Sequence, residues 1–325
     1  MDHPSDHLLE IISRHDYPEA ARRAVLDVER RLAADPAFAR HFDRAVCLAM
    51  GVDPDSPAAA PSAPWAQTRE PVGLGFALGR VSDLAKANGV GEELLQLVFL
   101  LRASEILKSR YAERGVPESR FWDSVEDFKF KLLECMECRG KPGTFVAGWN
   151  EGLLRMQRFT YGRFQYETAP FPGDDFATAC GRVVRWGETV VNFHIPSSGV
   201  PLSDAVRLAS YREAWQAYRD RFPDGRVVFL CTSWLLYPAQ REFLPASSNI
   251  LKFIDDFEIV RSGESDKFGD AWRIFGAAGG RPPEEWPRDT SLRRAYADWI
   301  LSGRKAGWGW GLIVFDGEKI VRAAE

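Results

Sequence analysis

The sequence predicts an α+β protein, with a helical N-terminal domain followed by a mixed β-sheet domain with flanking helices. In the first part, apolar residues recur at helical spacing, most clearly at 117–138. After residues 140–143, Gly-Lys-Pro-Gly, the pattern changes to short β-branched and aromatic runs separated by glycine-marked turns. A chain of 325 residues is long enough for two domains. We therefore place the domains at residues 1–142 and 143–325.

The N-terminal domain is predicted to consist of helices joined by short turns. The predicted helices share apolar stripes and terminal proline or glycine signals, and they cover residues 4–13, 18–34, 36–50, 74–87, 92–112 and 117–138. Residues 51–71 contain five prolines, which is typical of an extended surface connection. We expect Trp65 to anchor this connection.

The central element of the second domain is a strand–loop–helix–strand unit that begins at Val190. Residues 190–195 favour a strand, and two prolines and a glycine in 196–202 end it. Ser203 can cap the helix that follows, and residues 223–225, Pro-Asp-Gly, stop that helix. Residues 227–231 form a continuous apolar run, as expected of a strand covered on both faces. The unit predicts a crossover between two parallel strands.

The loop of this crossover lies at a helix N-terminus. Free backbone N–H groups and the helix dipole favour an anion, such as a phosphate, at that position. The alternative is an ordinary crossover loop that binds nothing. The residues alone leave these alternatives open.

The other strands are predicted from turn glycines and short apolar runs. One hairpin joins 152–159 to 163–167 about residues 160–162, and a second joins 181–186 to 188–195 about Gly187. Further elements are expected as strands at 257–261 and 272–276, short helices at 239–244 and 249–253, and a helix at 290–301.

The run 305–311 is rich in glycine and tryptophan. It fits either a flexible lid or a strand whose glycines let a neighbouring segment approach closely. The pair Asp316-Gly317 favours the strand, because it predicts a hairpin that joins 312–315 to 320–322.

Composition argues against several kinds of partner. The net charge is −4, and the absence of a Lys/Arg run argues against nucleic acid. No apolar segment approaches the ~20 residues that span a bilayer, so we expect no membrane association. The N-terminus is polar, unlike a signal peptide, and five cysteines without a regular framework favour reduced thiols in the cytoplasm.

No metal site is predicted. Cys135 and Cys138 form a C-x-x-C pair at the end of a helix, without the second ligand pair of a zinc site, so packing is the favoured role. The other candidates are histidines at solvated helical or terminal positions without metal-binding spacing, namely His3, His7, His15 and His41.

Three motifs link the second domain to a known family. They are Asn-Phe-His-Ile-Pro at 192–196, Ser-Trp-Leu-Leu-Tyr-Pro at 233–238 and Ser-Asn-Ile at 248–250. In this order and spacing, the chain resembles acyltransferase-like proteins with a helical N-acyltransferase N-terminal domain and a GNAT-like C-terminal domain. The resemblance implies that the crossover loop receives acetyl-CoA or another acyl-CoA. It also implies a sheet that ends in two antiparallel strands, which 257–261 and 272–276 fit.

The resemblance places acyl-CoA binding on residues of the loop and the helix start. These are Ile195, Ser197, Ser198, Gly199, Val200, Leu202 and Ser203. Ordinary GNAT loops carry a Gln/Arg-x-x-Gly-x-Gly/Ala pattern, whereas this loop has one glycine and a proline without an N–H group.

His194 is the main candidate for the general base of an N-acyl transfer. It ends a strand beside the loop, where ligands of open α/β sheets collect, and histidine suits proton transfer near neutral pH. The alternative is a core histidine bonded to backbone or to Ser233. Glu167 is a second candidate base and Tyr161 a candidate acid. Ser233 is a candidate for orienting substrate or for satisfying loop backbone.

Other residues have weaker claims. Cys231 ends the neighbouring strand. Its two alternative roles are a nucleophile paired with His194 and a buried residue that fills the core. Asn249 has the same two alternatives as Ser233. Arg158 and Arg163 flank the first hairpin turn. The alternatives for each are a bond to a carboxylate or phosphate and an ordinary solvated position.

The sequence therefore predicts transfer of an acyl group from acyl-CoA to an amine of a small molecule or peptide. The rival is a non-catalytic ligand-binding or interaction protein on a degenerate acyltransferase scaffold, which the proline-bearing loop favours. A weaker alternative is a thiol hydrolase or acyl carrier built on Cys231 and His194.

Overall fold

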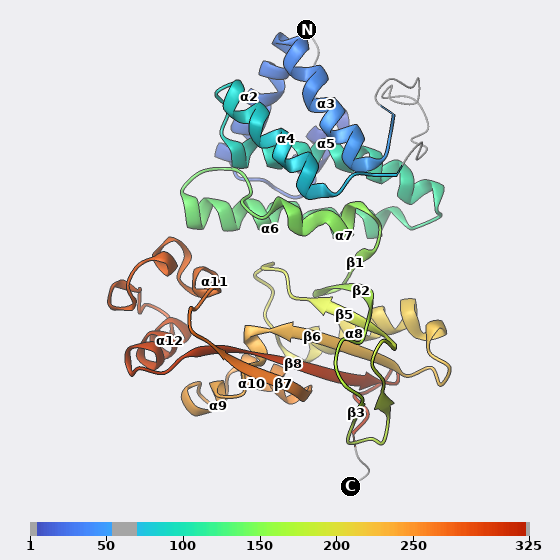
Figure 1. Cartoon of the computed structure of the whole chain (residues 1–325), viewed down its shortest axis with the longest axis vertical. Coiled ribbons are helices and arrows are strands. Elements are labelled where there is room, and N and C mark those ends of the chain that lie inside the picture. Colours follow the sequence, from blue (N-terminus) through green and yellow to red (C-terminus); the bar gives the residue numbers. More distant parts are fainter. Residues whose placement is uncertain (1–4, 54–69, 323–325) are drawn as a thin grey trace. The chain divides into compact units, whose positions relative to one another are not determined.

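The computed structural model describes residues 5–53 and 70–322. The chain divides into two compact units, Met1–Gln157 and Arg158–Glu325 (Figure 1). The division lies after the predicted boundary at 140–143. The short helical stretch between the two positions packs with helices of the first unit. Most of the proline-rich connection, including Trp65, lies outside the described residues.

The described part of the first unit is helical, as predicted. Its elements are α1 (Asp6–Arg14), α2 (Glu19–Ala34), α3 (Pro36–Met50), α4 (Leu74–Ala87), α5 (Glu92–Glu113), α6 (Glu118–Arg139), η2 (Ala147–Asn150) and α7 (Glu151–Leu154). Helix α5 packs against α1, α2, α3, α4 and α6. Residues 97–101 of α5 are all buried, so this turn of the helix is apolar on every side, as expected at the centre of a helical unit.

The second unit is built on a mixed six-stranded sheet in the order β1-β2-β5-β6-β8-β7 (Figure 1). Its strands are β1 (Arg158–Tyr161), β2 (Phe164–Pro170), β5 (Thr189–His194), β6 (Val227–Ser233), β7 (Glu258–Ser265) and β8 (Ala306–Phe315). Strands β5 and β6 are parallel, and every other neighbouring pair is antiparallel. A separate two-stranded sheet pairs β3 (Phe176–Ala177) with β4 (Val183–Val184).

Helical elements connect these strands. They are α8 (Asp204–Tyr218), η3 (Arg219–Arg221), η4 (Trp234–Leu236), α9 (Gln240–Phe243), α10 (Asn249–Asp255), α11 (Ala271–Phe275), η5 (Gly276–Gly280), η6 (Pro283–Glu285) and α12 (Ser291–Leu301). The predicted crossover is confirmed, because α8 joins the parallel strands β5 and β6. Ser203 is the N-cap residue of α8, but its side chain makes no capping hydrogen bond.

One face of the large sheet packs against α8. Tyr211 of α8 stacks on Phe164, and its ring lies 5.8 Å from that of Phe229. Ser210, also on α8, bonds the hydroxyl of Tyr166 at 2.9 Å. Because side chains alternate along a strand, the residues between these aromatics extend from the opposite face.

Three predicted elements are wrong. Residues 151–154 form α7 rather than a strand, so the first hairpin begins only at Arg158. The second predicted hairpin does not form, since β4 pairs with β3 and β5 pairs with β2. Residues 271–275 form α11 instead of a terminal strand, and β7 pairs with β8. Short apolar runs are compatible with either a strand or a helix, and the contacts made in the folded protein decide which one forms.

The glycine–tryptophan run is a strand, β8, as favoured. A Cβ added at Gly309 would lie 1.9 Å from the carbonyl oxygen of Leu236, and one at Gly311 would lie 2.9 Å from Phe257. The glycines therefore let η4 and Phe257 lie directly against β8. The predicted hairpin after Phe315 is reduced to one bridge, between Phe315 and Ile320.

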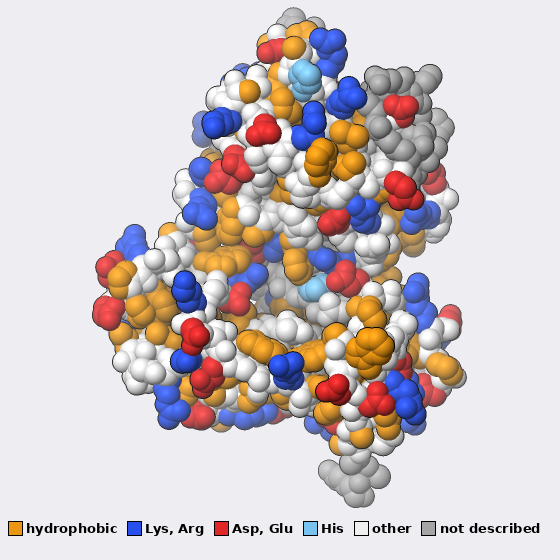
Figure 2. Space-filling model, viewed as in Figure 1, with side chains coloured by type: hydrophobic (Ala, Val, Ile, Leu, Met, Phe, Trp, Pro, Cys, Tyr) orange, Lys and Arg blue, Asp and Glu red, His pale blue; other side chains and the backbone are white. Residues whose placement is uncertain are grey.

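The visible face of each unit carries both signs of charge (Figure 2). Figure 2 shows Lys/Arg and Asp/Glu side chains interspersed on the visible face of each unit. None of the helices in the described ranges combines the length and apolarity needed to cross a bilayer.

Candidate active site

Two rows of polar residues cross β1, β2 and β5 on the sheet face opposite α8. The strand registers align Arg158 with Glu167 and Asn192 in the first row. They align Thr160 with Gln165 and His194 in the second row. Cross-strand partners share a face, and so do residues two apart on one strand. The two rows thus form one polar surface on a sheet whose other face is aromatic.

His194 and Glu167 are in direct contact on this surface. The His194 Nε2 atom lies 2.7 Å from Oε1 of Glu167. The Asn192 Nδ2 atom lies 3.2 Å from the same ring nitrogen and 3.5 Å from the same carboxylate oxygen. An ionised carboxylate only accepts hydrogen bonds, so Nε2 carries the proton toward Glu167. This tautomer puts the basic lone pair of the ring on Nδ1.

Glu167 is held in its ionised form. Its Oε2 atom accepts a bond from Nε of the buried Arg158 at 3.2 Å. Burial by itself raises the pKa of Glu167, but the hydrogen bond from His194 and the charge of Arg158 outweigh burial and lower it to about 2. A carboxylate with so low a pKa is a weak base at neutral pH. The geometry therefore favours His194 as the base and Glu167 as the group that orients it.

The parallel strands β5 and β6 separate beside His194. Their register includes only Val191 with Phe229 and Asn192 with Leu230. Beyond this point β5 stays paired to β2 as far as His194, and β6 stays paired to β8 as far as Ser233. The inner edges of the two strands thus diverge while their outer edges remain hydrogen-bonded. An extended ligand can add to such unpaired strand edges through main-chain hydrogen bonds.

Two arginines hold the loop between β5 and α8. Arg163, in the β1–β2 turn, donates to the carbonyl oxygens of Pro196 at 2.7 Å and Val200 at 2.9 Å. Arg207 of α8 donates to the carbonyl oxygen of Leu202 at 2.6 Å. Burial lowers the pKa of Arg163 to about 10, and the carbonyl oxygens that it bonds carry no compensating negative charge.

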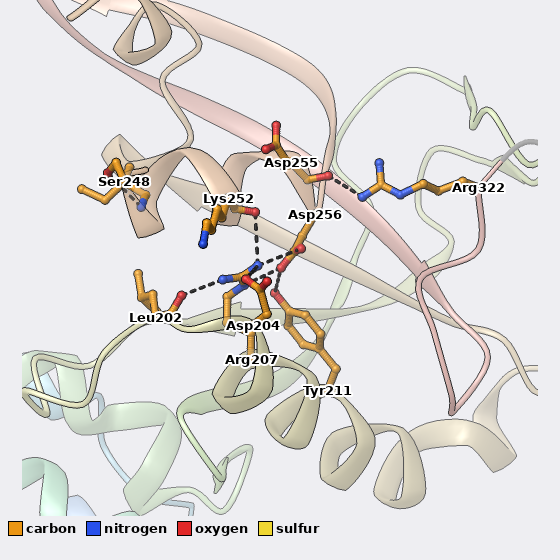
Figure 3. Close-up of polar contacts among 10 residues, drawn as sticks. Leu202, Asp204, Arg207, Tyr211, Ser248, Lys252, Asp255, Asp256 and Arg322 are labelled. Atoms are coloured by element: carbon orange, nitrogen blue, oxygen red, sulfur yellow. Dashed lines mark hydrogen bonds and ion pairs between the residues drawn. The ribbon is translucent and has the colours of Figure 1, made fainter. Parts of the chain in front are cut away.

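Arg207 also connects the loop to α10 (Figure 3). Its side chain is 3% exposed and donates through Nε to Oδ2 of Asp256 at 2.6 Å. A further bond goes to the carbonyl oxygen of Lys252 at 3.2 Å, and the hydroxyl of Tyr211 donates to Asp256 at 3.0 Å. The start of α8 and the end of the loop are thereby fixed to α10 by a buried ion pair.

The predicted loop residues lie together in this segment. Ser198 Oγ accepts a bond from the Val200 N–H group at 3.3 Å. Gly199 is exposed with φ of 75°, a left-handed conformation that favours glycine. Ile195 and Leu202 pack against the core, whereas Ser197 is exposed.

Other predicted site residues lie elsewhere. The Tyr161 ring contacts Tyr166 and Tyr218 on the α8 side of the sheet, away from His194. Ser233 caps η4, where its Oγ accepts the Leu235 N–H bond at 3.1 Å. Cys231 is buried, and burial raises the pKa of its thiol. Asn249 is the first residue of α10.

Cys231 does not pair with His194. Strand alternation puts Cys231 on the face of Phe229, while His194 shares the face of Asn192. The neutral thiol is also a poor nucleophile. The structure therefore does not support the thiol mechanism.

Sequence reasoning did not include Asn192 and Gln165 among the candidate site residues, and it did not specify the partner of Arg158. Polar residues alternate with aromatic ones in Gln-Tyr-Glu at 165–167 and Asn-Phe-His at 192–194. Such alternation indicates a strand with one polar face. This alternation was the one feature of the sequence that could have identified Asn192 and Gln165 as neighbours of His194 and Glu167.

The comparisons with known proteins agree with this architecture. A model described as N-acyltransferase N-terminal domain matches residues 6–156, and one described as GNAT-like C-terminal domain matches residues 159–313. The two domain matches and the fold thus define an acyltransferase-like class of protein. Together the two models match nearly the whole chain, which belongs to the acyltransferase-like proteins that join these two domains.

Solved acyltransferase structures share the fold at low sequence identity. One in complex with decanoyl-CoA is 22% identical, with a TM-score of 0.71 over 97% of this chain and 89% of its own. A mutant acyltransferase in complex with octanoyl-CoA is 19% identical, with a TM-score of 0.70 over 97% and 90%. A third, in complex with decanoyl-CoA and teicoplanin, is 21% identical, with a TM-score of 0.68 over 97% and 90%. No curated protein matches the chain.

Proposed function

We propose that this protein transfers an acyl group from an acyl-CoA thioester to the nitrogen of an amine acceptor. The observation that supports this best is the position of His194. It lies where β5 separates from β6, on the polar face and in contact with Glu167. A thioester between the diverging strands would lie beside a histidine oriented to accept a proton.

The acyl-CoA donor is assigned to the gap between β5 and β6 and to the loop that follows β5. Backbone N–H groups at the start of α8 favour the phosphate groups of coenzyme A. Arg163 and Arg207 fix the loop through its carbonyl oxygens. The complexes of fold neighbours with decanoyl-CoA and octanoyl-CoA make medium-chain acyl-CoA the first donors to test.

The reaction needs one proton acceptor and one leaving group. The amine nitrogen attacks the thioester carbon and gives a proton to Nδ1 of His194, while Glu167 stabilises the resulting imidazolium through Nε2. The C–N bond forms, the C–S bond breaks, and coenzyme A leaves as a thiolate that is then protonated. The products are an amide and free coenzyme A.

The acceptor is proposed to approach from the polar face. Tyr211 and the other α8 side chains fill the opposite face, where aromatic residues pack against the central strands. The nucleophile therefore reaches the strand gap from the side of His194. We assign the acceptor to amines of small molecules or peptides.

A transfer assay tests the proposal. Acetyl-, octanoyl- and decanoyl-CoA are each incubated with a panel of amino sugars, amino acids and short peptides, and coenzyme A release and product mass are measured. We expect His194→Ala to lower kcat by at least about 100-fold, the usual size of general-base effects. The matched control is His41→Ala, at an exposed position of α3, which should leave kcat unchanged. Equal activity of His194→Ala and wild type would contradict the proposal.

A further inference from the structure

Asn192 is a polar residue of the first row to which the proposed chemistry gives no role. Its Nδ2 atom lies 3.2 Å from Nε2 of His194 and 3.5 Å from Oε1 of Glu167. The last two atoms are themselves 2.7 Å apart. Side chains from two paired strands therefore meet at one point, where the amide of Asn192 contacts both the proposed base and the carboxylate that orients it.

The charge of Glu167 determines which end of the Asn192 amide faces the ring. An ionised carboxylate accepts hydrogen bonds and cannot donate them. The amide therefore turns its NH2 group, rather than its carbonyl oxygen, toward Oε1. Because Nε2 of His194 donates its own proton to the same oxygen, the amide and the imidazole are two donors that share one acceptor.

Glu167 and Asn192 act on the imidazole in opposite directions. A carboxylate beside Nε2 stabilises the protonated form of the ring. The NH2 group of Asn192 places partial positive charge 3.2 Å from the same nitrogen, and its bond to Oε1 occupies part of the accepting capacity of the carboxylate. Both effects of the amide disfavour a positive charge on the ring.

Two arginines on neighbouring elements add to the effect of the amide. Arg158 of β1 bonds Oε2 of Glu167 at 3.2 Å. Arg163 of the β1–β2 turn bonds the carbonyl oxygen of Pro196, two residues after His194. Each guanidinium is a cation and disfavours a further positive charge nearby. In the described part of the second unit, Glu167 is thus opposed by groups on β1, on the turn and on β5.

We infer that Asn192 is a positioning residue that keeps the His194 ring unprotonated at neutral pH, against the carboxylate of Glu167. The inference rests on the proposed function, in which the ring must be neutral to accept a proton from the amine. Glu167 by itself would orient the ring but would also hold a second proton on it. With Asn192 beside Nε2, the ring keeps its orientation and remains a base.

The test observes the ring directly, without donor or acceptor. Long-range ¹H–¹⁵N NMR spectra of the full-length protein labelled with ¹⁵N-histidine give the titration midpoint and tautomer of each ring, and His194→Ala identifies the His194 signals. Wild type is compared with Asn192→Leu, which removes the amide at similar size, and with Asn192→Asp, which adds a carboxylate. The matched control is Asn88→Leu in the first unit, where the amide bonds the carbonyl oxygen of Leu84 at 2.9 Å.

We expect the His194 midpoint to rise by about 0.5–1 pH unit in Asn192→Leu, the size of one net hydrogen bond. It should rise by at least about 1 pH unit in Asn192→Asp, because a second carboxylate stabilises the imidazolium. The control should leave the midpoint unchanged, and the wild-type ring should carry its proton on Nε2. An unchanged or lowered midpoint in Asn192→Leu would overturn the inference, as would a wild-type ring protonated on Nδ1.

A second variant keeps the inference testable if Asn192→Leu does not fold. Asn192→Asp has nearly the shape of the native side chain, and an unchanged His194 midpoint in this variant would also overturn the inference. The result is separable from the proposed function. Raised midpoints in a protein that binds neither decanoyl-CoA nor acetyl-CoA would support the effect of Asn192 on the ring and contradict acyl transfer. Unchanged midpoints in a protein that binds both would do the reverse.

Discussion

The Nε2 atom of His194 lies 2.7 Å from Oε1 of Glu167, across the antiparallel pair of β5 and β2. The two residues are diagonal neighbours, because the direct partner of Glu167 is Asn192. Arg158 holds the other carboxylate oxygen from β1. Three strands therefore fix the orientation of one imidazole ring. Such support from rigid elements is what a proton-transfer group requires.

Glu167→Gln tests whether the carboxylate orients and stabilises the ring. The substitution keeps the size of the side chain but removes the charge that stabilises a protonated imidazole. We expect kcat to fall by about 10- to 100-fold, and the acid limb of the pH–rate profile to move to lower pH. Steady-state kinetics between pH 5 and 9 check this, with the exposed Glu318→Gln as control. An unchanged profile would show that Glu167 does not act through His194.

Glu167 should also contribute to stability in a defined pH range. Its pKa is lowered from 4.5 to about 2 in the folded protein. The contribution is therefore fully present above pH 4.5 and is lost as pH falls toward 2, and it amounts to at most about 3 kcal/mol. Urea unfolding of wild type and Glu167→Gln should show a difference in free energy that shrinks over this range. A difference independent of pH would contradict the ion-pair account.

Much of the fold could be predicted from sequence, because long periodic segments identify helices independently of tertiary context. The helices of the first unit illustrate this, and so does the crossover through α8, where caps and breakers agree with the apolar pattern. The errors fall on predicted strands of five to eight residues. The Trp-Arg-Ile-Phe segment of α11 suits a strand by composition, but it folds as a helix that packs on α12.

The candidate site was only partly predictable. His194 and the loop follow from their place at the end of a strand. The rows around Glu167 depend on the register of three strands, which the sequence does not specify. Phe171 illustrates the difficulty, since its backbone bonds to Gly187 and Glu188 extend the β2–β5 ladder where a hairpin turn was predicted. Without that register, Gln165 cannot be placed beside His194.

Gly309 and Gly199 should respond differently to alanine. A Cβ at Gly309 would overlap the carbonyl oxygen of Leu236, which is backbone and cannot rotate away. We expect Gly309→Ala to lower the free energy of unfolding by at least about 3 kcal/mol. A Cβ at Gly199 meets nothing within 4 Å, so only the positive φ opposes it, at about 1 kcal/mol. Urea unfolding of both variants checks this, and equal losses would contradict the close packing of η4 on β8.

The ion pair of Arg207 and Asp256 should be strongly coupled. Arg207→Met leaves a largely buried carboxylate without its cation, and we expect a loss of about 3–5 kcal/mol in the free energy of unfolding. Asp256→Leu leaves a buried guanidinium in the same way. The double variant should be more stable than the sum of the two losses predicts, by at least about 1 kcal/mol. Additive losses in urea unfolding would show that the pair does not act as a unit.

The most direct measurement of the proposed function is calorimetric titration of the wild-type protein with decanoyl-CoA and with free coenzyme A. The strand gap and the arginine-held loop predict one site per chain for both ligands. They also predict a rise in melting temperature, because a ligand that binds only the native state stabilises it by about 2.7 kcal/mol at a hundredfold excess over Kd. The absence of binding heat and of any melting shift at millimolar acyl-CoA, extended to acetyl-CoA, would contradict the assignment of this fold to acyl transfer.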